Sequence, residues 1–126
     1  MNMEFSEQEI SDVKNFIISL NSKANSAVIV EGKRDADALK GLGFSGKVLE
    51  FHKFGGVSKF ADLASRYKHL IVLFDSDRKG RYLTGKIMEQ LERRTKVDLS
   101  FKKELVTITK GKIRCIEQLS CYKQLI

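Results

Sequence analysis

Residues 68–80 read KHLIVLFDSDRKG, a short apolar run that leads directly into two aspartates. The run at 70–74 is rich in branched and aromatic residues, which is typical of a strand buried on both faces of a parallel sheet. Side chains two positions apart in an extended backbone point to the same side, so we expect Asp75 and Asp77 to face one spot where the strand ends. Two like charges held together need a cation or a proton between them, and Mg²⁺ accepts carboxylate ligands. An ordinary aspartate-rich turn closed by Gly80 is the alternative.

The composition is that of one soluble globular domain. The chain has 126 residues, of which 42% are hydrophobic and 31% are charged. No apolar run is long enough to span a membrane, and the acidic, amphipathic segment SEQEISDVKNF near the amino terminus does not resemble a signal peptide. We therefore expect a cytoplasmic protein. Cys115 and Cys121 belong to no disulfide or zinc pattern, and we expect them to be packing residues.

The net charge of +7 is unevenly distributed along the chain. Residues 1–77 hold ten Lys or Arg against eleven Asp or Glu, whereas residues 78–126 hold thirteen against five. Basic charge clustered beside a carboxylate site indicates a polyanionic partner, most often nucleic acid. A solvated basic surface without a partner is the alternative.

Apolar runs and periodicity predict alternating strands and helices. A capping box at Ser6–Glu9 begins a helix to about Asn21, and further helices are expected at 35–42, 57–67, 80–94 and 111–125. Strands are expected at 27–30, 47–51, 70–74 and 101–108. Such alternation in one chain predicts a mainly parallel sheet of about four strands with helices on both faces.

Acidic residues follow two of these strands. Glu31 comes directly after the strand at 27–30, as Asp75 and Asp77 come after the strand at 70–74. Ligands of parallel α/β sheets bind beyond the carboxyl ends of the strands, so these three acids form a candidate site. Asp35 is expected to cap the helix that follows Glu31. Gly55 and Gly56, before the next helix, can present backbone N–H groups to a phosphate or can simply form a tight turn, and His52 beside them is either a substrate contact or a filler side chain.

The segments VIVEGKRDADAL (28–39) and LIVLFDSDRKG (70–80) resemble the Toprim domain of topoisomerases, bacterial primases, overcoming-lysogenization nucleases and ribosomal RNA maturases. The resemblance runs from Ser26 onward and is greatest to the small free-standing Toprim proteins of archaea. It implies a three-layer, Rossmann-like α/β fold at 26–126, with a helix at 1–25 packed on it. It also implies that Glu31 is a general acid/base and that Asp75 and Asp77 bind Mg²⁺.

The chain departs from the larger members of that family. Topoisomerases carry a nucleophilic tyrosine on a separate domain, and Tyr67, Tyr82 and Tyr122 have no such context here. The additional surfaces of primases and maturases have no counterpart. Phosphatases of the haloacid dehalogenase type share the paired aspartates but carry Thr or Val where Lys79 stands, so that activity is not expected.

Two functions agree with these residues. The first is an Mg²⁺-dependent enzyme, a nuclease or processing enzyme of RNA or DNA, with one or two Mg²⁺ ions, or Mn²⁺, held by Glu31, Asp75 and Asp77. The second is a non-catalytic RNA-binding module that is accessory to RNA processing. Both allow a larger RNA- or DNA-processing assembly, and neither involves a membrane. Neighbouring phosphates would be held by the basic residues and glycines near the acids, above all by Arg78: Lys33, Arg34, Arg78, Lys79, Arg81, Gly55 and Gly56.

Overall fold

The centre of the protein is a sheet of four parallel strands in the order β2-β1-β3-β4. The computed structural model describes residues 4–126. The strands are β1 (Ser26–Val30), β2 (Lys47–Glu50), β3 (His69–Val72) and β4 (Lys96–Asp98). The prediction of a mainly parallel sheet of about four strands is confirmed.

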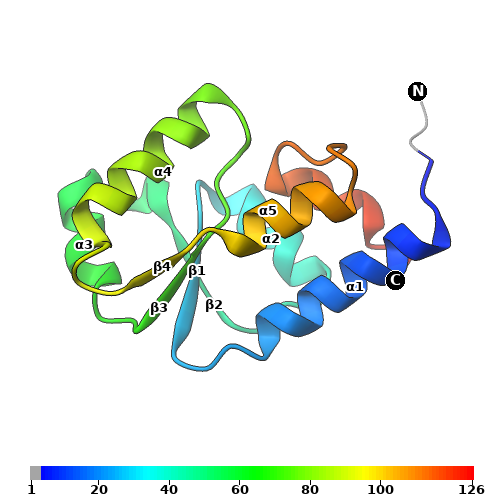
Figure 1. The fold of residues 1–126 in the computed structure, drawn as a ribbon, viewed down its shortest axis with the longest axis horizontal. Coiled ribbons are helices and arrows are strands. Elements are labelled where there is room, and N and C mark those ends of the chain that lie inside the picture. The colour runs from blue at the N-terminus through cyan, green and yellow to red at the C-terminus, as the bar shows by residue number, and fades with distance from the viewer. Residues whose placement is uncertain (1–3) are drawn as a thin grey trace.

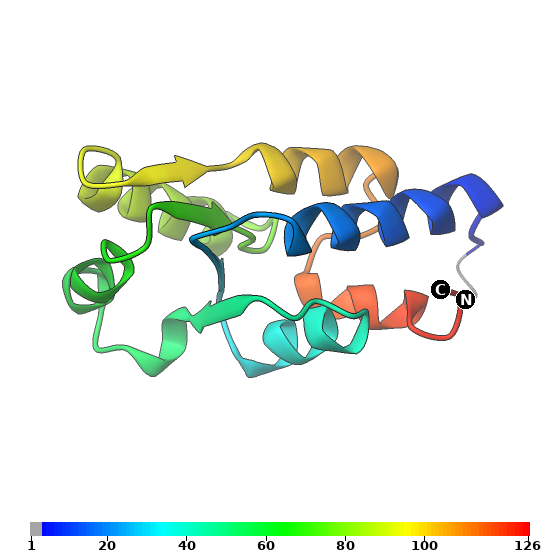
Figure 2. The same ribbon diagram turned by 90° about the horizontal axis from the view of Figure 1, so that it is seen from below.

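Helices cover both faces of this sheet, which makes three layers (Figures 1 and 2). One face is covered by α1 (Glu7–Asn21), α2 (Lys33–Gly41), α5 (Ser100–Ile108) and the 3₁₀ helix η2 (Ile116–Tyr122). The other face is covered by α3 (Val57–Ala64) and α4 (Arg78–Leu91). A second 3₁₀ helix, η1 (Phe51–Lys53), follows β2. None of the helices in residues 4–126 is long and apolar enough to cross a membrane.

The two central strands are buried on both faces because every residue after the first in each of them is apolar. Val28 and Ile71 belong to the core beneath α1, α2 and α5, whereas Ile29 and Val72 belong to the core beneath α3 and α4. All four side chains are almost completely buried. This two-sided burial explains the continuous apolar runs in the sequence.

The prediction of a fourth strand at 101–108 is wrong, because these residues form α5. Phe101 and Leu105 are buried four positions apart on one helical face, while Lys103 and Glu104 between them are exposed. The fourth strand is β4, which lies just upstream and pairs with β3. A strand of three residues is too short to show a periodicity in the sequence.

The predicted closing helix at 111–125 is also wrong in extent and type. Residues 111–115 are turn and loop, and only η2 is helical. Ile116, Leu119 and Tyr122 are buried three positions apart, and this spacing fits the three residues per turn of a 3₁₀ helix. Cys121 is exposed, so of the two thiols only the half-buried Cys115 has a share in packing.

Helix starts agree with the sequence for α1 and for α3, which begins at Val57 and ends at Ala64, and they shift in two other helices. Ser6 caps α1, with its hydroxyl oxygen accepting the Glu9 N–H at 3.1 Å. The helix expected at 35–42 starts two residues earlier, after Gly32, so Asp35 is not its N-cap but its third residue. The helix expected at 80–94 starts at Arg78 with Asp77 as its cap.

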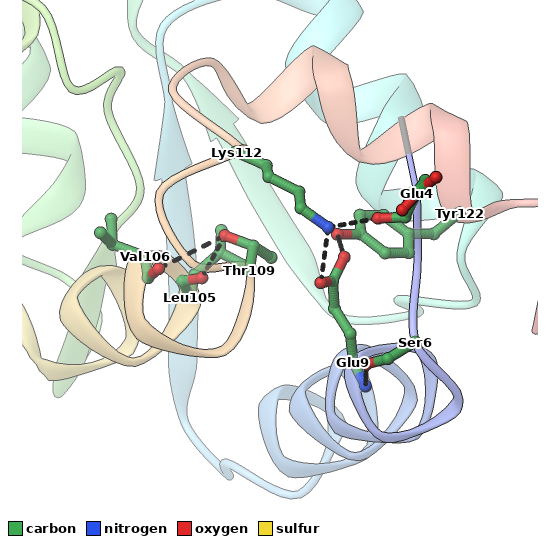
Figure 3. A network of polar contacts seen from close by, with 8 residues as sticks. All are labelled: Glu4, Ser6, Glu9, Leu105, Val106, Thr109, Lys112 and Tyr122. Carbon is green, nitrogen blue, oxygen red and sulfur yellow. Dashed lines mark hydrogen bonds and ion pairs between the residues drawn. The ribbon is translucent and has the colours of Figure 1, made fainter. Parts of the chain in front are cut away.

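A buried carboxylate ties the two ends of the chain together (Figure 3). Glu9 on α1 is 2% exposed, and it accepts the hydroxyl of Tyr122 at 2.5 Å and the Lys112 ammonium at 2.9 Å. Lys112 also donates to the carbonyl of Glu4. Burial alone would raise the pKa of Glu9, but the hydrogen bonds from Tyr122 and Lys112 outweigh it and lower that pKa. The ionised form of Glu9 is therefore the one that the fold stabilises.

Replacing Tyr122 with Phe removes one hydrogen bond to this carboxylate and leaves the core volume almost unchanged. The free energy of unfolding in urea is expected to fall by about 1.5–3 kcal/mol at neutral pH, as for other hydrogen bonds to charged groups. Because the folded-state pKa of Glu9 is lowered, its contribution is present above the ordinary carboxyl pKa and is lost as pH falls through the lowered value. The difference between the two proteins should therefore shrink in acid. Tyr82→Phe, at a tyrosine that is 62% exposed, is the matched control and should change little.

Candidate functional site

The carboxyl ends of β1, β2 and β3 surround a hollow of about 450 Å³. Glu31 follows β1 directly, His52 lies in η1 after β2, and the aspartate segment follows β3. The structure thus brings Glu31, Asp75 and Asp77 to one place, as the sequence predicts. The hollow is lined by acids, by bases and by residues of the turns between them: Glu31, Gly32, Lys33, Arg34, Asp35, His52, Asp75, Asp77, Lys79 and Glu117.

Glu31 is the least exposed of the three predicted acids, with an exposed fraction of 6%. One of its carboxylate oxygens accepts the backbone N–H of Asp75 at 2.9 Å, which joins the end of β1 to the segment after β3. Burial, together with the negative charges of Asp75 and Asp77, raises the pKa of Glu31 above its ordinary value, although the Asp75 N–H favours the carboxylate. The glutamate is therefore a carboxyl group that retains its proton to a higher pH than an exposed one.

Asp75 and Asp77 are positioned by two different helices. One oxygen of Asp75 accepts the N–H of Ile116 at 3.3 Å, at the start of η2. Asp77 caps α4 by accepting the N–H of Gly80 at 2.7 Å. Residues 76–77 form a bend after the strand, so the two side chains do not continue the alternation of β3, yet both line the same hollow.

Gly80 is required by the close approach of the chain to itself. A Cβ atom at this position would lie 2.0 Å from the carbonyl oxygen of Asp75, a backbone atom that cannot move aside without moving the aspartate. The glycine three positions after Asp77 therefore permits the tight bend that presents both carboxylates.

The donor set suits a hard cation. One oxygen each of Glu31, Asp75 and Asp77 accepts a backbone N–H, and the other accepts no backbone N–H of residues 4–126. No three acidic, histidine or cysteine side chains in this part of the chain converge closely enough to make a complete cation cage. Mg²⁺ does not need such a cage, because it is usually bound by one or two carboxylates while keeping several waters. The residues therefore fit Mg²⁺ by their chemistry.

The basic residues predicted at the site are distributed over a wider area. Lys33, Arg34 and Lys79 line the hollow. Arg81 instead lines a neighbouring cavity, where it donates to the carbonyl of Ser76 at 3.3 Å. Arg78, the residue with the strongest expectation from the sequence, is exposed at the first position of α4 and does not line the hollow.

The two predicted phosphate-binding glycines also lie outside the residues that line the hollow. Gly56 is the N-cap of α3 and has a φ of 106°, a conformation that favours glycine whatever else the position does. The turn therefore accounts for Gly56 without a ligand.

Two acids reach the site that sequence reasoning did not place there. Asp35 is buried, and its two oxygens accept the N–H groups of Gly32 and Glu117 at 3.2 and 3.1 Å. Burial, followed by the charge of Asp75, raises the pKa of Asp35. Glu117 itself comes from η2, and the sequence gives no signal that would bring residues 35 and 117 together.

Lys102 is a further residue that the sequence did not single out. Its ammonium donates to the carbonyl of Phe74 at 2.6 Å, immediately before Asp75. Burial lowers the pKa of Lys102, and the charge of Asp75 opposes that shift. The lysine lies on α5, so a prediction of strand at 101–108 could not show which way it points.

A family model described as the Toprim domain matches residues 26–110, more than half of the chain. A UPF0292 protein of Thermococcus gammatolerans is 37% identical over 94 residues, which cover 74% of this chain and 70% of that protein. A UPF0292 protein of Methanocaldococcus jannaschii is 38% identical over 98 residues, covering 75% of this chain and 76% of that protein.

The fold is also found among solved structures. A protein from Aquifex aeolicus superposes with a TM-score of 0.68 at 26% sequence identity, covering 84% of this chain and 96% of that chain. The matched segment of the family model, residues 26–110, contains all four strands and the acids that follow β1 and β3. The chain therefore belongs to the Toprim domain family, whose members generally bind Mg²⁺ and serve metal-dependent functions connected with nucleic acids.

Proposed function

We propose that this protein is an Mg²⁺-dependent enzyme that cleaves phosphodiester bonds of RNA or DNA. The observation that carries the proposal is the 2.9 Å hydrogen bond between the Asp75 N–H and the Glu31 carboxylate. This bond holds the buried carboxyl group of Glu31 beside the segment that carries Asp75 and Asp77. A group that can transfer a proton thus lies next to two carboxylates that can bind a cation.

Each residue has a distinct role in this proposal. Glu31 donates or accepts the proton of the reacting oxygen, which its raised pKa and its buried position favour. Asp75 and Asp77 would hold the cation, and Glu31 lies beside them at the same hollow. When bound, Mg²⁺ or Mn²⁺ would orient the phosphate and neutralise the charge that develops on it.

The basic residues around the hollow would bind the phosphates on either side of the one that reacts. They lie at the exposed starts of two helices, where their long side chains can reach a polyanion: Lys33, Arg34, Arg78, Lys79 and Arg81.

We also propose that the protein works in the cytoplasm and within a larger RNA- or DNA-processing assembly. A non-catalytic RNA-binding module would use the same residues, and only turnover separates the two.

Binding of Mg²⁺ should depend on both aspartates. Asn keeps the acceptor oxygen for Ile116 or Gly80, so Asp75→Asn and Asp77→Asn should fold as the wild type does, and Asn also remains a good helix cap. Calorimetry should show Mg²⁺ affinity reduced by at least about tenfold, the lower end of what changes near a metal ligand cause. Glu89→Gln, which removes an exposed acid farther along α4, is the control. Equal Mg²⁺ affinity in all four proteins would refute the ligand assignment.

Nucleic acid should bind mainly by electrostatic attraction, and it should bind to the basic residues near Glu31, Asp75 and Asp77. Replacing Arg78, Lys79 and Arg81 with Gln should weaken binding to all sequences alike. The slope of log affinity against log salt should become shallower by about 0.7–0.9 for each phosphate that the variant no longer neutralises.

The matched control replaces three other basic residues with Gln, at the amino ends of the strands and so at the opposite edge of the sheet. Lys47, Lys68 and Lys96 are exposed at or just before the first residues of β2, β3 and β4. If this second triple variant shows the larger decrease in slope, the phosphates bind elsewhere.

Cleavage should depend on Glu31 more than on any other single acid. Glu31→Gln keeps an oxygen that can accept the Asp75 N–H but removes the group that transfers the proton. Binding of labelled RNA and DNA should persist, while cleavage in Mg²⁺ should fall by about two to four orders of magnitude. Glu50→Gln, at the end of the neighbouring strand β2, is the control. A wild type that binds but cleaves neither substrate in Mg²⁺ or Mn²⁺ would establish the binding module instead.

A further inference from the structure

A second cavity, of about 660 Å³, lies on the other side of Asp75, between α4 and α5. The two helices stand on either side of the chain that follows β3 (Figure 1). The cavity exists because β4 is short. Its pairing with β3 ends at Ile71 and Asp98, and the chain then turns into α5 at Ser100. Beyond that point no strand in residues 4–126 covers this edge of the segment from Val72 to Phe74.

The cavity combines an apolar interior with basic side chains at its mouth. Its apolar lining consists of Val72, Phe74, Leu99 and Val106. Arg81 from α4 and Lys103 from α5 are both exposed at its border. Its size lies in the range of pockets that bind small organic groups. An apolar slot between cations suits a flat aromatic group that carries a phosphate.

An added strand from another protein is a poorer fit to this sheet edge. Such a strand would need the backbone acceptors of the chain after β3, and the carbonyl of Phe74 already accepts the Lys102 ammonium at 2.6 Å. The positive side chains at the mouth also favour an anionic occupant.

Asp75 borders both this cavity and the acidic hollow. A phosphate held at the acids would thus have its neighbouring nucleoside beside the apolar slot. We propose that the α4–α5 cavity binds one unpaired nucleobase of the strand whose phosphate lies at Glu31, Asp75 and Asp77. The inference rests on the proposed function and extends it to the substrate, which must be single-stranded or open at that position, because a paired and stacked base cannot enter a side pocket.

The test compares two labelled oligomers of equal length, a single-stranded oligonucleotide and the same sugar–phosphate chain without bases. Affinities are measured by fluorescence anisotropy at low salt, in Mg²⁺ and again in EDTA. The wild type should bind the oligonucleotide at least about fivefold more tightly than the abasic chain, the lower end of what one bound base contributes.

Two substitutions fill the cavity from opposite walls, Val106→Trp on α5 and Thr84→Phe on α4. Both should abolish the preference for bases and leave the affinity for the abasic chain unchanged. Glu104→Trp places the same indole on an exposed position of α5 that does not line the cavity, and it should keep the preference. In the unmodified protein, methyl NMR signals of Val72, Leu99 and Val106 should shift with the oligonucleotide and not with the abasic chain, which tests the site even if a variant fails to fold.

The outcomes separate this inference from the proposed function. Equal binding of both oligomers by the wild type, or a preference that survives in a folded Val106→Trp or Thr84→Phe protein, would overturn the nucleobase site while leaving the phosphodiester site in place. Methyl signals that do not move with the oligonucleotide would do the same. A wild type that binds neither oligomer would overturn the proposed function together with this inference.

Discussion

The hydrogen bond from the Asp75 N–H to the buried Glu31 carboxylate extends the pairing of the two central strands beyond the sheet. Just before it, the N–H of Leu73 donates to the carbonyl of Ile29 at 2.9 Å. A slip of one residue in this register would turn the apolar side chains of β3 to the wrong cores and would also move the aspartates away from Glu31. The packing of both helical layers and the assembly of the acids therefore depend on the same strand pair.

This arrangement concentrates negative charge where solvent is partly excluded. Burial and mutual repulsion raise the pKa values of Glu31 and Asp35, so ionising them costs more than in water. Backbone N–H groups offset part of that cost, because Asp75 donates to Glu31 while Gly32 and Glu117 donate to Asp35. A cation placed among these carboxylates would offset the cost further, because an opposite charge favours their ionised forms.

The ends of the chain support the site from a distance. The 3₁₀ helix η2 donates to Asp75 through its first residue, Ile116, and to Glu9 on α1 through its last residue, Tyr122. Because η2 also packs against α2, the buried contact at Glu9 holds in place a segment that presents one of the aspartates. On the other side of the site, Lys102 of α5 fixes the carbonyl of Phe74 next to Asp75. The aspartate segment is thus held from both flanks by elements that contribute no predicted ligand.

The sequence by itself determined β1 and β3, the capped start of α1 and the meeting of Glu31 with Asp75 and Asp77. These features follow from local patterns, since a strand buried on both faces must be apolar throughout and parallel strands end at one edge. The tertiary structure alone decided the helical state of 101–108, the three-residue strand β4 and the approach of Asp35, Lys102 and Glu117 to the site. An eight-residue apolar pattern fits either a strand or a helix until its packing partner is known. Contacts between residues as far apart as 35 and 117 leave no periodicity in the chain, because they arise only when separate helices pack on the same face of the sheet.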